Sequence, residues 1–141
     1  MPASRDPAGR AATNREPFEY AVVVVVPRVE RGERFNAGIV LHSRPHRFIA
    51  ARTYLDEGLL RALAPDCDPE TVRRHLDAIV RIAAGDPSAG PIARLGPSER
   101  FHWLVAPSST IVQPMEVHTG LTDDPDAELA HLFLTMVTAR G

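Results

Sequence analysis

Lysine is absent from the sequence, and all 16 residues counted as lysine or arginine are arginine. This absence excludes mechanisms that need an amine side chain, such as Schiff-base formation, and the lysine-dependent phosphate sites of P-loop proteins and kinases. Codon usage in a GC-rich genome, which also enriches alanine and proline, accounts for such a composition without any functional reason. Recognition of an anion by this chain must therefore use arginine, histidine or backbone N–H groups.

Cysteine is nearly absent as well, because Cys67 is the single one in the chain. No disulfide can form within the chain, and no cysteine-based zinc cluster can be built. The sequence also lacks the G-x-G-x-x-G, P-loop, G-x-S-x-G and H-E-x-x-H motifs. We therefore predict no cofactor and no metal site, and a protein without enzymatic activity is the favoured of the two interpretations.

Long hydrophobic runs are missing too. The longest, residues 21–26, is far shorter than the about 20 residues that span a bilayer, and residues 1–16 lack the apolar segment of a signal peptide. We predict a cytoplasmic protein without membrane association. The Pro-, Ala- and Arg-rich composition of residues 1–16 predicts a disordered arm. A length of 141 residues predicts a single domain, over residues 17–141. The net charge of −2 argues against a protein that binds nucleic acid over its whole surface.

Three β-strands are predicted in the N-terminal half, over residues 19–27, 35–41 and 48–54. Residues 22–26 are five consecutive valines, apolar on both faces, which favours a central strand covered on both sides. The short connections predict antiparallel hairpins and hence a β-meander. Further short strands are predicted at 110–113 and 115–119.

Four segments have the pattern of helices. Asp56 and Asp68 are expected to cap the first two, and Asp124 precedes the last. Residues 98–106 fit a helical or a strand pattern; we favour a helix with Ser98 as its N-cap. The predicted fold class is α+β: an antiparallel β-meander of about three N-terminal strands plus one or two later short strands, packed with three to four helices.

The stretch over residues 98–122 is the richest in functional residue types. It contains Arg100, His102, Trp103, Gln113, His118 and Thr119. Arginine and histidine can hold an anion, tryptophan can stack on a planar group, and His102 or His118 could act as a general acid or base. We assign no catalytic residue, because the alternative is a core Trp103 with polar residues that satisfy loop backbone. The site hypothesis requires Arg100, His102 and His118 to meet in one accessible pocket.

The turn histidines and the uneven charge of the chain have simple structural interpretations. His42 and His46 flank a predicted turn and are interpreted as exposed polar residues. Residues 28–52 hold six arginines against two glutamates, a balance of +4, whereas residues 116–128 hold five acidic residues and no arginine. These basic hairpins fit a nucleic acid or an acidic partner, but a solvated sheet edge is the simpler interpretation.

With these residues in view, the chain resembles the bacterial DUF3037 family of small uncharacterised proteins from Tyr20 to Val137. The resemblance depends on YAVVVVVP, ERFNAGIVL, the helical segment 69–83 and, above all, SERFHWLVAPSSTIVQPMEVHTGLTDDP. The shared positions include Asn36, Gly38, Arg100, His102, Trp103, Gln113, His118, Thr119 and Gly120. This chain departs from the family pattern at Ala37, where valine is usual, and at Ser108, where arginine is commoner. The second departure removes an anion contact from that loop.

The resemblance implies a single-domain protein without an established activity, and some members are encoded beside HipA-like kinases. Our first hypothesis is an interaction or accessory module that acts in a complex with a protein partner. It is motivated by the small size, the lack of a recognisable catalytic set and the opposite charge of the two regions above. The alternative is a small-molecule binding protein or enzyme with an Arg/His pocket around residues 100–120, with Asn36 as a further candidate. Nucleic-acid binding through the Arg-rich hairpins ranks third.

Overall fold

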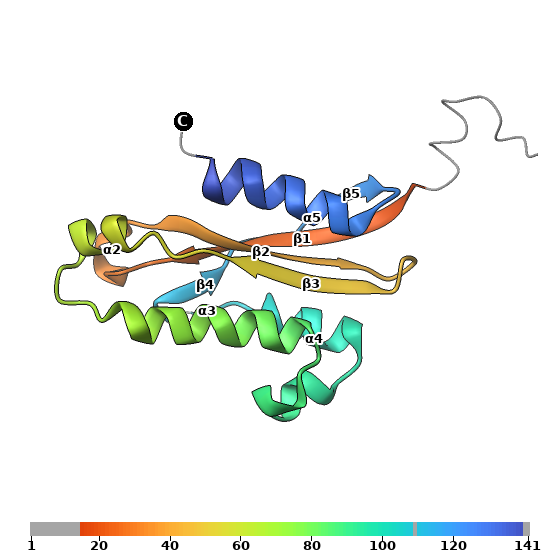
Figure 1. The fold of residues 1–141 in the computed structure, drawn as a ribbon, viewed down its shortest axis with the longest axis horizontal. Helices are drawn as coiled ribbons and strands as arrows, with labels where there is room; N and C mark the ends of the chain where they lie inside the picture. Colours follow the sequence, from red (N-terminus) through yellow and green to blue (C-terminus); the bar gives the residue numbers. More distant parts are fainter. Residues whose placement is uncertain (1–14, 109, 140–141) are drawn as a thin grey trace, which may run out of the picture.

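The computed structural model describes residues 15–108 and 110–139, which form an antiparallel five-stranded sheet with helices on both faces (Figure 1). Helix α5 lies on one face, and α3 and α4 lie on the other. The strands are β1 (Glu16–Val25), β2 (Phe35–Ser43), β3 (Phe48–Thr53), β4 (Val112–Pro114) and β5 (His118–Thr122). The α-helices are α2 (Glu57–Leu63), α3 (Pro69–Ala83), α4 (Pro97–Leu104) and α5 (Pro125–Phe133). The α+β prediction is confirmed.

Strand β1 is the centre of the sheet. It pairs with β2 on one side and with both β4 and β5 on the other, and β3 continues the sheet beyond β2. The predicted meander is thus β1, β2 and β3. The two later strands fall at 112–114 and 118–122, slightly after the predicted positions.

The valine run of β1 separates two hydrophobic cores. Val23 and Val25 pack with side chains of α3 and α4, whereas Val22, Val24 and Val26 pack with side chains of α5. Each of the five is at most 7% exposed. Successive strand residues point to opposite faces, so a strand that is apolar on both faces needs cover on both. The sequence-based expectation of a doubly covered strand is confirmed.

The pairing of β1 with β2 is interrupted by a β-bulge, which falls between Val23 and Val24 of β1. Val23 pairs with Gly38 and Val24 with Asn36, so one residue of β2 is skipped. A Cβ on Gly38 would lie 2.9 Å from the carbonyl oxygen of Arg52 on β3. Glycine is needed there because the neighbouring backbone approaches too closely for a side chain.

Aspartates cap three of the helices, as predicted. The side chain of Asp56 accepts a hydrogen bond from the N–H of Leu59, and Asp124 accepts one from Ala127. Asp68 accepts a hydrogen bond from the N–H of Glu70 at 3.1 Å. Each carboxylate satisfies an N–H group that has no partner inside the helix.

The N-cap of helix α4 lies two residues earlier than predicted. The prediction of a helix over 98–106 is confirmed, but Ser98 is not the cap: Gly96 occupies that position and Pro97 is the first helical residue. Proline suits the first position because the N–H it lacks would have no helical acceptor. The carboxylate of Glu99 accepts a hydrogen bond from the N–H of Gly96.

The predicted N-terminal arm lies, for residues 1–14, outside the described residues. Glu16, which we assigned to the arm, is the first residue of β1. Over residues 15–108 and 110–139, none of the helices has the length and apolar character needed to cross a membrane.

Candidate functional site

Arg100 stabilises the end of a neighbouring helix. Its guanidinium donates to the carbonyl oxygen of Leu95 at 2.6 Å and to that of Ala83, the last residue of α3, at 3.3 Å. A cation at a helix C-terminus satisfies free carbonyls and complements the helix dipole. Arg100 therefore has a structural role in this geometry.

His118 and Thr119 are neighbours in sequence but lie on opposite faces of the sheet. His118 pairs with Tyr20, whose ring centroid is 5.4 Å from that of His118, on the face covered by α5. Thr119 pairs with Glu19 on the other face. His102 is exposed on α4, beyond the sheet from His118. The structure therefore does not bring Arg100, His102 and His118 into one pocket.

Asn36 binds the turn that follows α5 rather than an open site. Its side-chain amide donates to the carbonyl oxygen of Met136 at 2.9 Å. Met136 lies in a π-helical turn, Leu134–Thr138, that directly follows α5. In a π-helical turn the hydrogen bonds span five residues, so its carbonyls are displaced from the usual helical partners. Asn36 thus fixes this turn to β2.

Trp103 and Gln113 are brought together, in a groove of about 360 Å³ between α3, the end of α4 and strand β4. We call it the Trp103 groove. Trp103 is 51% exposed and forms one wall, whereas Ile79 and Ile82 of α3 contribute to the apolar floor. Among the described residues that line it, His75 is the one ionisable side chain. The interpretation of Trp103 as a core anchor is wrong, because half of its surface faces solvent.

His42 is the polar residue that sequence reasoning placed wrongly. It is 4% exposed, not an exposed turn residue, and its Nδ1 lies 2.9 Å from Oε2 of Glu19. Its ring is stacked on Phe101 of α4 with centroids 5.3 Å apart. His46, by contrast, is half-buried at the turn, with Nε2 3.0 Å from the carbonyl oxygen of Thr122.

The residue periodicity of β2 contained a signal for this burial. Val40 faces α3 and α4 with Val23, and His42 follows two positions later on the same face. The sequence could place His42 on that face, but not Phe101, which is 59 residues away and supplies the cover.

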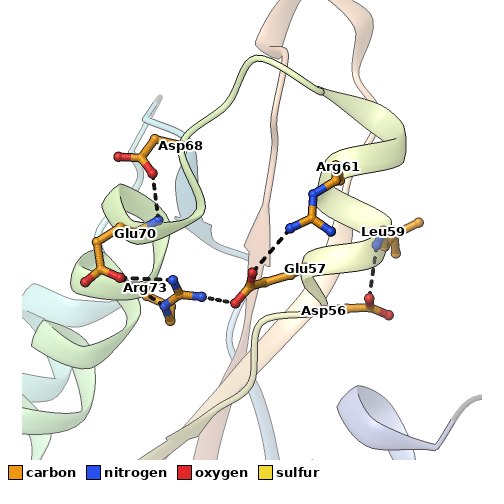
Figure 2. Close-up of polar contacts among 7 residues, drawn as sticks. All are labelled: Asp56, Glu57, Leu59, Arg61, Asp68, Glu70 and Arg73. Carbon is orange, nitrogen blue, oxygen red and sulfur yellow. Dashed lines mark hydrogen bonds and ion pairs between the residues drawn. The ribbon is translucent and has the colours of Figure 1, made fainter.

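A third group of residues forms an ionic network between α2 and α3 (Figure 2). The carboxylate of Glu57 contacts Arg73 and lies 3.7 Å from Arg61, and Arg73 also contacts Glu70 at 3.0 Å. A hollow of about 550 Å³ lies beside it. The charged residues lining that hollow are Glu70, Arg73, Arg74 and Asp77. Their formal charges cancel, so this hollow does not favour an ion of either sign.

Glu57→Gln is expected to lower the free energy of unfolding by no more than about 1 kcal/mol at low salt, because the side chains of this network are exposed and screened. In about 1 M NaCl the difference should vanish. Urea denaturation at both salt concentrations measures it, with Glu30→Gln, an exposed residue without an ion pair among the described residues, as the control. A loss above about 2 kcal/mol that persists in high salt would show that the network is more than a surface feature.

Cys67 is not arranged as a nucleophile. Burial, followed by the nearby Asp66 and Asp68 carboxylates, raises the pKa of its thiol, and the opposing influence of Arg28 is smaller. The thiol therefore stays protonated near neutral pH, whereas reactivity needs the thiolate. Among residues 15–108 and 110–139, no three His, Cys, Asp or Glu side chains are grouped to hold a metal ion.

The six arginines of residues 28–52 do not form one basic surface. Arg28 and Arg31 lie at one end of β2, with Arg28 paired to Asp66 at 2.9 Å and Arg31 to Glu33 at 3.2 Å. Arg44 and Arg47 lie in the turn at the other end of this nine-residue strand, about 30 Å away at 3.3 Å per residue. These four arginines are therefore divided between the two ends of β2.

The chain matches a known protein family. The family described as "Protein of unknown function (DUF3037)" matches residues 20–137, a range that contains both the Trp103 groove and His42. No curated protein and no solved structure matches the chain.

Proposed function

The chain belongs to the DUF3037 family, and we propose that it is an interaction module that binds an extended apolar segment of a partner protein in the Trp103 groove. The observation that carries this proposal is the half-exposed Trp103 over an apolar groove. Tryptophan is among the residues that contribute most to binding energy at protein interfaces. An exposed apolar patch with a polar rim is typical of an interaction site, and Trp103 together with the apolar lining of the groove forms such a patch.

The lining of the Trp103 groove suits binding better than chemistry. Apolar side chains from α3 and from the loop with Pro107 surround Trp103, and His75 is the one ionisable group among the described lining residues. Grooves with exposed aromatic side chains receive proline-containing peptide segments, which lose little conformational entropy on binding, and Trp103 is the aromatic side chain here. We therefore assign the groove to an extended, proline-containing segment of the partner.

The edge of β4 indicates how that segment is held. Pro114 has no backbone N–H, and the carbonyl oxygen of Val112 already accepts a hydrogen bond from Oγ1 of Thr110 at 2.7 Å. The backbone N–H and C=O of Gln113 point toward Val24 of β1. The backbone groups of Val112 and Pro114, on either side of Gln113, therefore point to the open edge. Of the four backbone positions at this edge, the N–H of Pro114 is missing and the carbonyl of Val112 is occupied, so an added strand has only two groups to pair with. The partner segment is expected to bind through side chains rather than by strand addition.

A displayed peptide library tests this proposal, with a HipA-like kinase from the same genome, the partner class that the family resemblance suggests, examined in parallel. Selected peptides should shift the fluorescence of Trp103, the single tryptophan of the chain, to shorter wavelength. Trp103→Ala should weaken binding at least tenfold, equivalent to about 1.4 kcal/mol, because it removes a wall of the groove.

The matched control is His102→Ala, since His102 is exposed on the same helix but does not line the groove. It should change peptide affinity less than about twofold, which is within the range of near-neutral interface positions. Peptides that bind Trp103→Ala as tightly as the natural chain would contradict the proposal. A library that gives no groove-dependent peptide would do so too, as would a groove that accepts only small aromatic compounds.

A further inference from the structure

A second hollow lies at the turn between β2 and β3, on the face of the sheet that α4 covers. Two adjoining cavities open there, of about 180 and 470 Å³, and both are lined by His42 and Arg44. Glu19 and Thr119 contribute to the smaller one, and Arg47 and Ser98 contribute to the larger. This hollow shares none of these residues with the Trp103 groove.

His42 is held in one orientation at this hollow. Its side chain is 4% exposed, its Nδ1 is hydrogen-bonded to Glu19, and Phe101 stacks on its ring. A carboxylate can only accept, so the proton of the pair sits on Nδ1. Among the described residues Nε2 has no hydrogen-bond partner, yet it is not sealed from solvent. Nε2 is therefore the ring nitrogen available to a ligand in the hollow that His42 lines. It accepts a hydrogen bond from a ligand hydroxyl, and in the doubly protonated ring it donates one to an oxyanion.

The two arginines of the turn are not used within the protein. Arg44 and Arg47 are exposed, and no ion pair or hydrogen bond joins either guanidinium to the rest of residues 15–108 and 110–139. With Glu19 at −1, the two arginines at +2 and a neutral His42, the lining carries a formal charge of +1. Guanidinium groups bind carboxylates and phosphates with paired hydrogen bonds.

The backbone of Arg47 adds an independent observation. Its φ is +53°, and it is the one non-glycine residue with a positive φ in the described part of the chain. This left-handed conformation is unfavourable for L residues and is normally taken by glycine or asparagine. Arg47 thus places a long cationic side chain where glycine would be more stable, and such strained backbone positions cluster at ligand-binding sites.

Ser98 completes the larger cavity. It is the second residue of the eight-residue helix α4, so its hydroxyl lies at the positive end of that helix. This end of α4 favours negative charge in the same cavity as the two arginines.

We propose that this hollow is a binding site for the oxyanion of a small acidic ligand, a phosphate or a carboxylate group, held by Arg44, Arg47 and the Nε2 of His42. The site lies on elements that the fold makes rigid, β1, β2 and α4, with the turn arginines at its rim. Glu19 does not contact the anion in this proposal; it positions His42.

The test is a titration of the full chain with inorganic phosphate and, separately, with sodium acetate, followed by NMR at constant ionic strength. The ring signals of His42 and the backbone amides of residues 44–48 should shift and saturate. Arg44→Gln should weaken the binding at least fivefold. Arg52→Gln, an exposed arginine of β3 outside both cavities, should change it less than twofold. Tighter binding of phosphate identifies a phosphate ligand, and tighter binding of acetate identifies a carboxylate.

Arg47→Gly separates loss of binding from loss of folding. Glycine relieves the left-handed backbone, so the urea midpoint should rise while the affinity for the anion falls at least threefold. Shifts that do not saturate, that sodium chloride reproduces, or that Arg44→Gln and Arg52→Gln alter equally would overturn the proposal, because they indicate screening rather than a site.

Discussion

Val23→Asp and Val24→Asp are each expected to unfold the protein. Val23 is 1% exposed and Val24 is 2% exposed, in the middle of the central strand. A single buried carboxylate without a partner costs about 3–5 kcal/mol or more, a large part of the about 5–15 kcal/mol that stabilises a domain. Because the two side chains enter different cores, both substitutions should be equally severe. In a sheet covered on one face, only one of two neighbouring residues would be sensitive.

Circular dichroism and urea denaturation of each purified variant measure the effect. Val29→Asp is the matched control, since Val29 is 54% exposed just beyond the same strand and should tolerate the charge within about 0.5 kcal/mol. If the aspartates prevent purification, Val23→Thr and Val24→Thr keep the shape and bury one hydroxyl each, at about 1–3 kcal/mol. A large loss at one position and none at the other would contradict the two-sided packing.

The sequence predicts this layered architecture well because the relevant signals are local. Five valines in a row require cover on both faces, whatever supplies it. Asp56 and Asp68 precede their helices at the positions where a carboxylate can reach a free N–H group. Each of these features depends on residues within a few positions of one another, and the structure confirms them.

The candidate site was harder to predict, because a site depends on which distant residues meet. His118 and Thr119 are adjacent in sequence, but strand alternation sends their side chains to opposite faces of β5. Arg100 lies close to them in sequence, but the end of α3 binds its guanidinium. A stretch dense in functional residue types is therefore not a cluster in space.

His42 shows the opposite case, in which scattered residues form one site. Glu19 lies 23 residues before it and Phe101 lies 59 residues after it. Period-two alternation along β2 indicates the face on which His42 lies. No local pattern indicates that a phenylalanine from the later helix α4 will cover it.

Phe101→Ala is expected to lower the free energy of unfolding by about 3–5 kcal/mol. Phe101 is 1% exposed and points from α4 into the core shared by the sheet and α3, so truncation leaves a cavity as large as the ring. The same substitution removes the ring that stacks on His42. His42 should then lose its fixed orientation, and the affinity for an oxyanion should fall together with stability.

Phe101→Leu distinguishes the two effects. Leucine keeps most of the buried volume, so stability should fall by less than about 1.5 kcal/mol. The aromatic ring is nevertheless lost, so the ring protons of His42 should move away from the positions that stacking imposes in the NMR spectrum. Arg52→Gln, the exposed residue of β3 outside both cavities, should alter neither stability nor the His42 signals. A Phe101→Leu variant whose His42 signals and anion affinity are unchanged would show that Phe101 fills the core without positioning the histidine.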